Sequence, residues 1–354
     1  MAYTDIDKSD EYFNTLTYTG DGVSPKGITG VGFQPDLVWI KNRGTTNYYL
    51  LQDVVRGATS TNVLSSNDTT AEPSFTNIGY ISSFNSDGFT ATSSGGSLAV
   101  LNASGNSYVS WNWLAGGTAS SNTDGSITSS VSANTTSGFS VVSYSGGGSF
   151  GDTVGHGLGS VPAMIIIKTT NATSSWYTWN KGMGATDNQF MDFSTGALQT
   201  SGATIFDVSA MSSTTFTLGT NTDVNGSGSP KIAYCFADVK GFSKMGSYTG
   251  NGSTDGTFVY TGFKPSFILV KNIQTTVNSW EIHDNKRDPF NVGTKRLYPN
   301  ASASEGSGTY VDMLSNGFKW RSTDGGHNSA NTFIYMAFAE HPFVTSTGIP
   351  ACAR

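Results

Sequence analysis

Residues 32–41 read GFQPDLVWIK, and the phrase returns as GSVPAMIIIK at residues 159–168 and as GFKPSFILVK at residues 262–271. Each copy has a Pro, then five mostly apolar residues, then a Lys. Pro is tolerated at the first residue of a strand, where its missing N–H costs little, and β-branched and aromatic residues favour strands. An almost unbroken apolar run of this length predicts a strand that is covered on both faces or lies at an interface.

Further landmarks surround this Pro-to-Lys phrase in the same order in each copy. Before the phrase comes a Tyr-x-Gly turn, which begins at Tyr18, Tyr144 and Tyr248. After the phrase comes an aromatic residue with a polar residue four positions on, in the pairs Tyr49/Asp53, Trp176/Asn180 and Trp280/Asp284. A strand-like segment closes each copy, at residues 108–113, 232–237 and 333–339. This order predicts three tandem units of about 100–120 residues, a usual domain size.

The composition indicates the fold class. Only 12% of the residues are charged, and Gly, Ser, Thr and Asn are abundant. Ser, Thr and Asn compete with the helix backbone for hydrogen bonds, and Gly is entropically costly in a helix, so a helix-rich protein is excluded. The 12% of aromatic residues argue against disorder. We therefore expect an all-β chain of three tandem β-sandwich or jelly-roll-like repeat domains.

The expected domains follow from the landmarks and from one stretch of low complexity. Residues 118–136 are mostly Ser, Thr, Asn and Gly, a composition typical of a flexible linker. We expect an N-terminal arm at 1–14, β repeats at 15–117, 137–243 and 244–344, a Ser/Thr/Gly linker at 118–136, and a C-terminal tail at 345–354.

Charge and hydropathy exclude several partners. The net charge of −6 and the pI near 5.1 argue against nucleic acid, which needs a basic surface. No apolar run approaches the roughly 20 residues of a membrane-spanning helix, so membrane insertion is not expected. The N-terminus has no basic region followed by an apolar core, so we expect no secretory signal and synthesis in a reducing cytoplasm.

Residues that could carry chemistry are few. The segment 280–284 reads WEIHD, but a retaining glycosidase needs two neighbouring carboxylates, and the strand face that carries Glu281 continues with His283 and Asn285. The four histidines are scattered, with no metal-ligand spacing. We therefore expect no enzyme activity, no catalytic residues, no cofactor and no metal.

Two Asp-x-x-Arg pairs recur at matching places. They are Asp53/Arg56 in the first unit and Asp284/Arg287 in the third, whereas the second unit has Asn180 where the Asp would stand. A pair that one copy has lost is more typical of an ion pair that braces a loop than of a ligand clamp. We expect loop-bracing ion pairs at these four residues.

Aromatic residues could also stack on sugar rings. Aromatic residues that recur at equivalent strand positions usually belong to a core or an interface. The exceptions are Tyr48, Tyr177 and Trp179, which lie on or beside the most variable stretch of their units. If the protein contacts a receptor or a glycan, we expect the contact at these three residues.

The first unit contains the motifs GFQPDLVWIKNR at residues 32–43, DVVRG at 53–57, SDGF at 86–89 and YVSWNW at 108–113. These motifs resemble those of a family of tailed-phage virion proteins that is abundant in marine viruses. The match is ordered over most of the first unit. The third unit keeps the Pro-to-Lys phrase, the Asp-x-x-Arg pair and the Gly-Phe turn, whereas the second unit lacks the pair and the turn.

The resemblance implies a structural component of the particle and implies no catalytic residues. A tail fibre or tail-tip component that takes part in host attachment is the main expectation. A head-surface (decoration) protein and a carbohydrate-binding β-sandwich protein are the alternatives. The expected location is the virion, made in the host cytoplasm and released by lysis. The expected partners are further copies of the chain as a trimer, other virion proteins and a host surface glycan.

Overall fold

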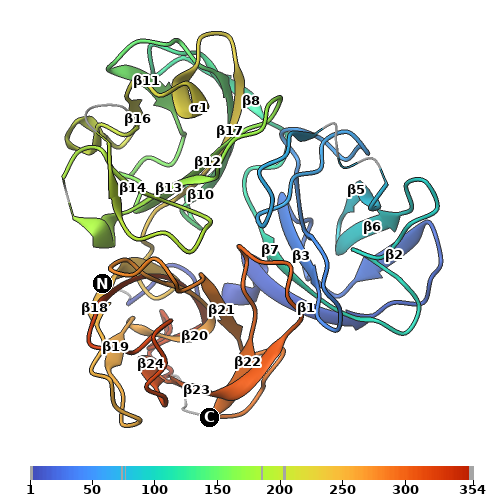
Figure 1. Ribbon diagram of the computed structural model, residues 1–354, viewed down its shortest axis with the longest axis vertical. Coiled ribbons are helices and arrows are strands. Elements are labelled where there is room, and N and C mark those ends of the chain that lie inside the picture. Colours follow the sequence, from blue (N-terminus) through green and yellow to red (C-terminus); the bar gives the residue numbers. More distant parts are fainter. Residues whose placement is uncertain (1–2, 73–74, 76, 185, 202–204, 351–354) are drawn as a thin grey trace.

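The computed structural model describes residues 3–72, 75, 77–184, 186–201 and 205–350 (Figure 1). Nearly all of its regular structure is antiparallel β-sheet, which confirms the predicted all-β fold. Single helical turns interrupt the strands at η1 (Ser9–Glu11), η3 (Lys181–Met183), η4 (Val208–Ala210) and α1 (Thr222–Asn225). Within the described residues, no helix is long and apolar enough to cross a membrane.

The first unit is a sandwich of two sheets, with the strand orders β1-β7-β3-β4 and β2-β6-β5. Apolar side chains from both sheets, among them Ile40, Leu50, Phe89 and Leu101, form a core of their own between the sheets. The strands are β1 (Phe13–Thr19), β2 (Lys26–Thr29), β3 (Leu37–Asn42), β4 (Tyr49–Asp53), β5 (Tyr80–Asn85), β6 (Gly88–Thr92) and β7 (Ser107–Trp113).

The second unit has one large sheet, of order β15-β14-β13-β12-β17-β10-β9-β8, and a small sheet of β11 and β16. The strands are β8 (Ser120–Asn122), β9 (Ser129–Asn134), β10 (Phe139–Ser145), β11 (Asp152–Gly155), β12 (Met164–Thr169), β13 (Tyr177–Asn180), β14 (Gln189–Asp192), β15 (Gln199–Thr200), β16 (Thr215–Leu218) and β17 (Pro230–Phe236).

The third unit repeats the sandwich of the first, with the sheets β18-β25-β20-β21 and β19-β24-β23-β22. The strands are β18 (Ser243–Thr249), β19 (Phe258–Tyr260), β20 (Phe263–Asn272), β21 (Glu281–Asp284), β22 (Gly293–Arg296), β23 (Gly306–Leu314), β24 (Gly317–Trp320) and β25 (Thr332–Pro342).

The Pro-to-Lys phrase holds the same topological position in each unit. It forms β3, β12 and β20, and each of these strands lies between the closing strand of its unit and a hairpin partner. The closing strands β7, β17 and β25 pair on their other side with the opening strands β1, β10 and β18. The registers also agree, since Leu37 pairs with Trp113, Met164 with Phe236 and Phe267 with Phe338.

The predicted linker at 118–136 is wrong, because this stretch contains β8 and β9. Both strands extend the large sheet of the second unit beyond β10. Ser129 is buried, and its hydroxyl donates to the carbonyl of Gly155 at 2.9 Å. The ladder of hydrogen bonds is made by the backbone, so small polar residues can form a strand, and composition alone did not separate this strand from a linker.

The three units form three lobes around a common centre (Figure 1). Aromatic rings from all three lobes meet there. The ring centroid of Trp113 in the first unit lies 6.2 Å from that of Phe236 in the second and 5.9 Å from that of Phe338 in the third, and Phe236 and Phe338 lie 6.1 Å apart. Phe13 stacks on Phe338 at 4.8 Å. The shared core therefore joins the lobes into one body.

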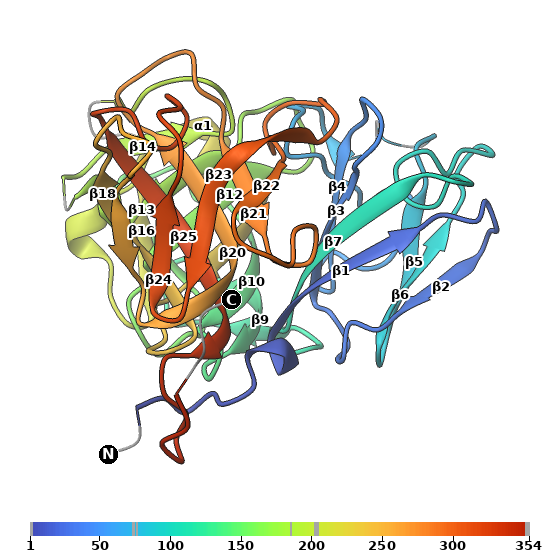
Figure 2. The same cartoon turned by 90° about the horizontal axis from the view of Figure 1, so that it is seen from below.

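The N-terminal arm packs on the third unit of its own chain. The hydroxyl of Tyr3 donates to the carbonyl of Gly262 at 2.7 Å, and Ile6 is buried. The backbone N–H of Ser346 in the C-terminal tail donates to Asp7 Oδ1 at 2.6 Å. Arm and tail therefore lie together at one end of the molecule, from which β3, β12 and β20 run toward the opposite end (Figure 2).

Candidate functional site

Three buried lysines connect the units. Lys41, Lys168 and Lys271 end the three Pro-to-Lys phrases, and each is 0% exposed. Each Nζ donates one hydrogen bond to a loop carbonyl of its own unit and one to a carbonyl of a neighbouring unit. The neighbouring acceptors are Ser302 O for Lys41 (3.2 Å), Thr69 O for Lys168 (2.9 Å) and Thr195 O for Lys271 (3.1 Å). The bonds run from the first unit to the third, from the second to the first and from the third to the second, so they close a ring.

Burial makes the charge of these lysines costly. It lowers the pKa of Lys41, of Lys168 and of Lys271 from 10.5 to about 8. The carbonyls that accept from each Nζ offset part of this cost, because an ammonium group has three donors to satisfy. The contribution of the lysine ring to the contacts between units therefore depends on pH.

Asp53 and Arg56 form the ion pair that their spacing predicts. Arg56 Nε lies 2.6 Å from Asp53 Oδ2, and Arg56 Nη1 lies 2.5 Å from Glu72 Oε1. Burial disfavours the charge of the guanidinium, but the carboxylates of Asp53 and Glu72 outweigh it and hold the pKa of Arg56 above its ordinary value. Tyr234 of the second unit donates to Asp53 Oδ2 at 2.9 Å. The pair therefore contacts the neighbouring unit as well as its own loop.

Asp284 and Arg287 repeat this arrangement in the third unit. Arg287 Nε lies 2.5 Å from Asp284 Oδ2, and its Nη1 lies 3.0 Å from Glu305. Trp111 of the first unit donates to Asp284 Oδ2 at 3.1 Å. Glu305 also pairs with Arg43 of the first unit at 2.8 Å. Both Asp-x-x-Arg pairs therefore join units, a role that their sequence spacing alone did not reveal.

In the second unit, neutral residues replace the Asp, the Arg and the Glu of this ion-pair arrangement. Asn180 stands for the Asp, and its amide donates to the carbonyl of Tyr335 in the third unit at 3.1 Å. Met183 stands for the Arg and is buried. Leu198 stands for the Glu, because its N–H donates to Ile273 O just as that of Glu72 donates to Thr170 O. The three substitutions occur together, so no buried carboxylate loses its cation.

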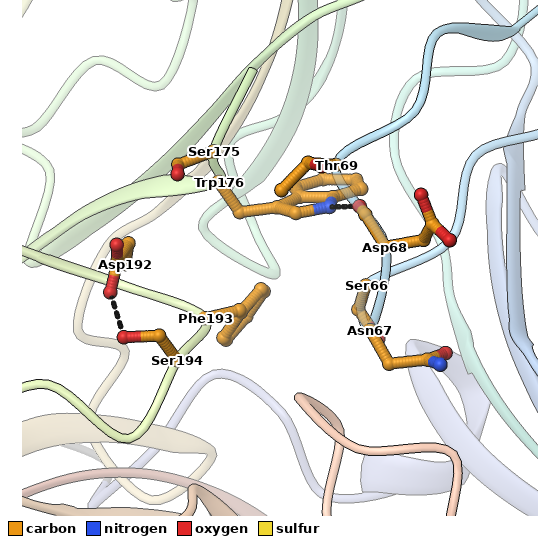
Figure 3. Close-up of a pocket in the computed structure, with 9 residues that line it drawn as sticks. All are labelled: Ser66, Asn67, Asp68, Thr69, Ser175, Trp176, Asp192, Phe193 and Ser194. Carbon is orange, nitrogen blue, oxygen red and sulfur yellow. Dashed lines mark hydrogen bonds between the residues drawn. The ribbon is translucent and has the colours of Figure 1, made fainter. Parts of the chain in front are cut away.

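A pocket of about 250 Å³ opens beside the lysine ring, between the first and second units (Figure 3). Trp176 and Phe193 project into it, with ring centroids 6.0 Å apart. The indole N–H of Trp176 donates to Asp68 O at 3.2 Å and thereby ties the two walls together. The lining residues are Ser66, Asn67, Asp68, Thr69, Ser175, Trp176, Asp192, Phe193 and Ser194. The pocket lies at the lysine end of the strands, away from the N-terminal arm.

We call this cavity, defined by the nine lining residues above, the axial pocket. Polar groups dominate its walls. Asp68 Oδ1 accepts from the N–H of Thr70 at 2.7 Å, and Asp192 Oδ1 accepts from the hydroxyl of Ser194. Hydroxyl, amide and carboxylate groups around aromatic rings suit a small ligand that is rich in hydroxyl groups, such as one sugar residue.

The aromatic residues predicted as ligand contacts lie elsewhere. The prediction for Trp179 is wrong, because this residue is buried in the core and does not line the axial pocket. Tyr177 is half-buried, its hydroxyl donates to Asp223 Oδ2 at 2.9 Å, and burial raises its pKa to about 12. Tyr48 is 36% exposed and packs edge-on against Phe75. Instead, the neighbouring Trp176 lines the axial pocket.

A second group of side chains was not predicted from the sequence. Glu281 Oε2 lies 2.8 Å from His327 Nδ1 and 3.3 Å from His283 Nε2, inside the third unit. The two histidines are 327 − 283 = 44 residues apart, so no local spacing could reveal the contact. The alternation of Glu281 and His283 along one strand was the only signal.

The chain matches a protein family over residues 8–342. The family is described as Domain of unknown function (DUF7483). No curated protein matches the chain.

Proposed function

We propose that this chain, which belongs to the DUF7483 family, is a structural protein of a bacteriophage virion, within a tail fibre or tail tip that takes part in host attachment. The resemblance of the first unit to virion proteins of marine tailed phages is the starting point. The observation that carries the proposal is that the two ends of the molecule differ. Both described termini lie at one end, and the axial pocket opens at the other. An attachment protein needs one end for the particle and one for the host.

The internal contacts suit such a building block. The aromatic centre, the lysine ring and the ion pairs join three sandwiches into a body without flexible linkers between them. Such a body keeps its two ends at a fixed distance and orientation, as a building block of a straight fibre must. The proposal places the chain in the virion, made in the host cytoplasm and released by lysis, with other virion proteins and further copies of itself, as a trimer, as partners.

Labelling the chain in purified particles tests the location. An antibody against the exposed loop around Phe290, which is 76% exposed, would be applied to intact particles and viewed by electron microscopy. We expect label at the tail fibre or tail tip. Label spread over the head would favour the decoration alternative, and particles that lack the chain would overturn the proposal.

The axial pocket favours a sugar residue of the host surface as the receptor, which also fits the carbohydrate-binding alternative. We expect Thr69→Trp to abolish binding on a glycan array, because Thr69 is exposed at the pocket and its contacts with Lys168 and Ser174 are made by its backbone carbonyl, which the substitution keeps. The matched control is Thr135→Trp, on an exposed turn of the second unit. Binding that survives in Thr69→Trp would remove the pocket from the proposal, and release of sugar during the assay would favour an enzyme.

A further inference from the structure

Three metal-binding side chains meet inside the sandwich of the third unit. Glu281 and His283 lie on β21, and His327 precedes β25. One nitrogen of each imidazole and one oxygen of the carboxylate lie within 4.8 Å of one another. None of the three residues is more than 2% exposed. Tetrahedral ligands at roughly 2.0–2.2 Å from a metal are about 3.3–3.5 Å apart. The Glu281–His283 distance of 3.3 Å matches this spacing, and the Glu281–His327 distance of 2.8 Å is shorter, so His327 must move slightly to admit an ion.

The same positions in the first unit hold no such ligands. Val270 pairs with Glu281 and Ile40 with Leu50, each one residue before the buried lysine, so Glu281 corresponds to Leu50. Two positions on, His283 corresponds to Gln52 by the same registers.

The correspondence of His327 follows from a tyrosine contact. Tyr248 donates to the carbonyl of His327 at 2.5 Å, and Tyr18, at the matching place of the first unit, donates to Leu101 O at 2.7 Å. His327 therefore corresponds to Leu101. One unit of three has acquired a glutamate and two histidines together at positions where the first unit has two leucines and a glutamine.

Such a replacement is costly without a compensating ligand. A buried charged network is often no more stabilising than apolar residues of the same volume, and it is frequently less so. Either a bound substrate or a bound ion would account for the presence of the three polar side chains. Because the three side chains are enclosed, a substrate cannot reach them, which leaves the ion.

The outer nitrogens of both imidazoles are held as they are in metal sites. His283 Nδ1 lies 3.2 Å from the carbonyl of Lys295, and His327 Nε2 lies 2.7 Å from the hydroxyl of Ser322. Ligating histidines usually make such a bond with the nitrogen that faces away from the metal. Arg296 Nη1 lies 3.0 Å from Glu281 Oε1, which leaves Oε2 to face the imidazoles.

The hydrogen bond of His283 Nδ1 leaves Nε2 to face the carboxylate. A carbonyl can only accept, so Nδ1 must carry the proton that points at Lys295 O. Nε2, the other nitrogen of the ring, lies 3.3 Å from Glu281 Oε2, on the side where the three side chains meet.

We propose that Glu281, His283 and His327 bind one divalent transition-metal ion that stabilises the third unit, with Zn²⁺ as the best match. Two imidazoles and a carboxylate suit Zn²⁺ and its first-row neighbours, whereas Mg²⁺ and Ca²⁺ prefer oxygen ligands. The site goes beyond the proposed attachment function and does not depend on it.

The test uses the full chain after treatment with a chelator. We expect Co²⁺ to produce visible ligand-field absorption that saturates at about one ion per chain, Zn²⁺ to displace it, and Zn²⁺ to move the midpoint of urea unfolding to higher urea. The triple variant Glu281→Leu/His283→Gln/His327→Leu copies the first unit and should fold but lose all three effects. The control is His156→Gln, which removes another buried histidine, in the second unit, and should keep them.

Ser322→Ala covers the case in which the triple variant fails to fold. It removes the partner of the outer nitrogen of His327, together with a weak acceptor for the N–H of Asp324, and we expect about 10–100-fold weaker Co²⁺ binding. No absorption with the wild-type chain would overturn the proposal, because hydrogen bonds among the three side chains would then explain the cluster. Equal Co²⁺ binding by the wild type, the folded triple variant and Ser322→Ala would overturn it as well, because the ions would then sit on the surface.

Discussion

At the scale of single residues, Lys168 links two units through a charge that burial makes expensive. Burial lowers its pKa from 10.5 to about 8 in the folded protein. In the unfolded chain the pKa returns to its ordinary value, so between about pH 8 and 10.5 the unfolded state binds more protons, and the stability conferred by this residue rises with pH. We expect the free energy of unfolding of the wild type, relative to Lys168→Met, to increase by about 1–2 kcal/mol from pH 8 to pH 9.5.

Urea unfolding at several pH values measures this difference. Lys286→Met is the control, because it removes an exposed lysine that lies outside the lysine ring. A difference for Lys168→Met that stays constant up to pH 9.5 would mean that the carbonyls of Thr69 and Ser174 hold the ammonium charged throughout.

Other single residues explain why the sequence landmarks recur. The glycine of each Tyr-x-Gly turn, Gly20, Gly146 or Gly250, lies against the backbone of the loop before the closing strand. A Cβ on Gly250 would lie 2.1 Å from Ser329 O, and one on Gly20 would lie 2.3 Å from Ala103 O. A side chain cannot fit there, so the repeated glycine reports a close approach of two segments.

At the scale of elements, the sequence predicted the strands that carry a strong pattern. The apolar run between Pro and Lys predicted a strand that is covered on both faces or lies at an interface, and β3, β12 and β20 are buried along their whole length. It could not predict β8 and β9, because their residues favour turns and linkers and only the pairing of β9 with β10 and of β8 with β9 makes them strands. Local preference decided the first case and tertiary context the second.

The ion-pair group gives a prediction at the same scale. Arg56→Met alone leaves the carboxylates of Asp53 and Glu72 without their cation, and we expect a loss of about 3–5 kcal/mol. The triple variant Asp53→Asn/Arg56→Met/Glu72→Leu reproduces Asn180, Met183 and Leu198 of the second unit. It should recover most of that loss, to within about 1–2 kcal/mol of the wild type.

Urea unfolding of the wild type and of the two variants gives the comparison. The triple variant should be more stable than the single variant although it carries more substitutions. If it is as unstable as Arg56→Met or worse, the second unit does not hold an equivalent interface, and the correspondence of the three units fails at this point.

At the scale of the whole molecule, the candidate site could not be predicted from the sequence. The axial pocket combines residues 66–69 of the first unit with residues 175–176 and 192–194 of the second, and no local pattern links these segments. The sequence pattern also favoured Trp179 over Trp176 as a ligand contact. Both residues are buried in the largest apolar cluster, but only Trp176 lines the axial pocket. The sequence predicted three copies of a module but could not predict how the copies face one another.

The shared core leads to the last prediction. The largest apolar cluster contains residues of all three units, whereas Phe89 belongs to a separate cluster inside the first unit. If the units were independent, Phe89→Ala would lower the melting temperature of one of several heat-absorption peaks. Because the lobes share Trp113, Phe236 and Phe338, we expect scanning calorimetry to show a single peak that Phe89→Ala moves as a whole by about 4–7 °C, the shift expected for a loss of about 3–5 kcal/mol in a chain of this length.

Trp113→Ala provides the complementary measurement. This substitution removes the ring that contacts both other units, and it should lower the same single peak by a similar amount. A peak that splits in Trp113→Ala but not in Phe89→Ala would show that the aromatic centre is what couples the lobes. Separate peaks in the wild type would instead mean that the contacts between units are too weak to unite them, and a rigid body would then no longer support the attachment function.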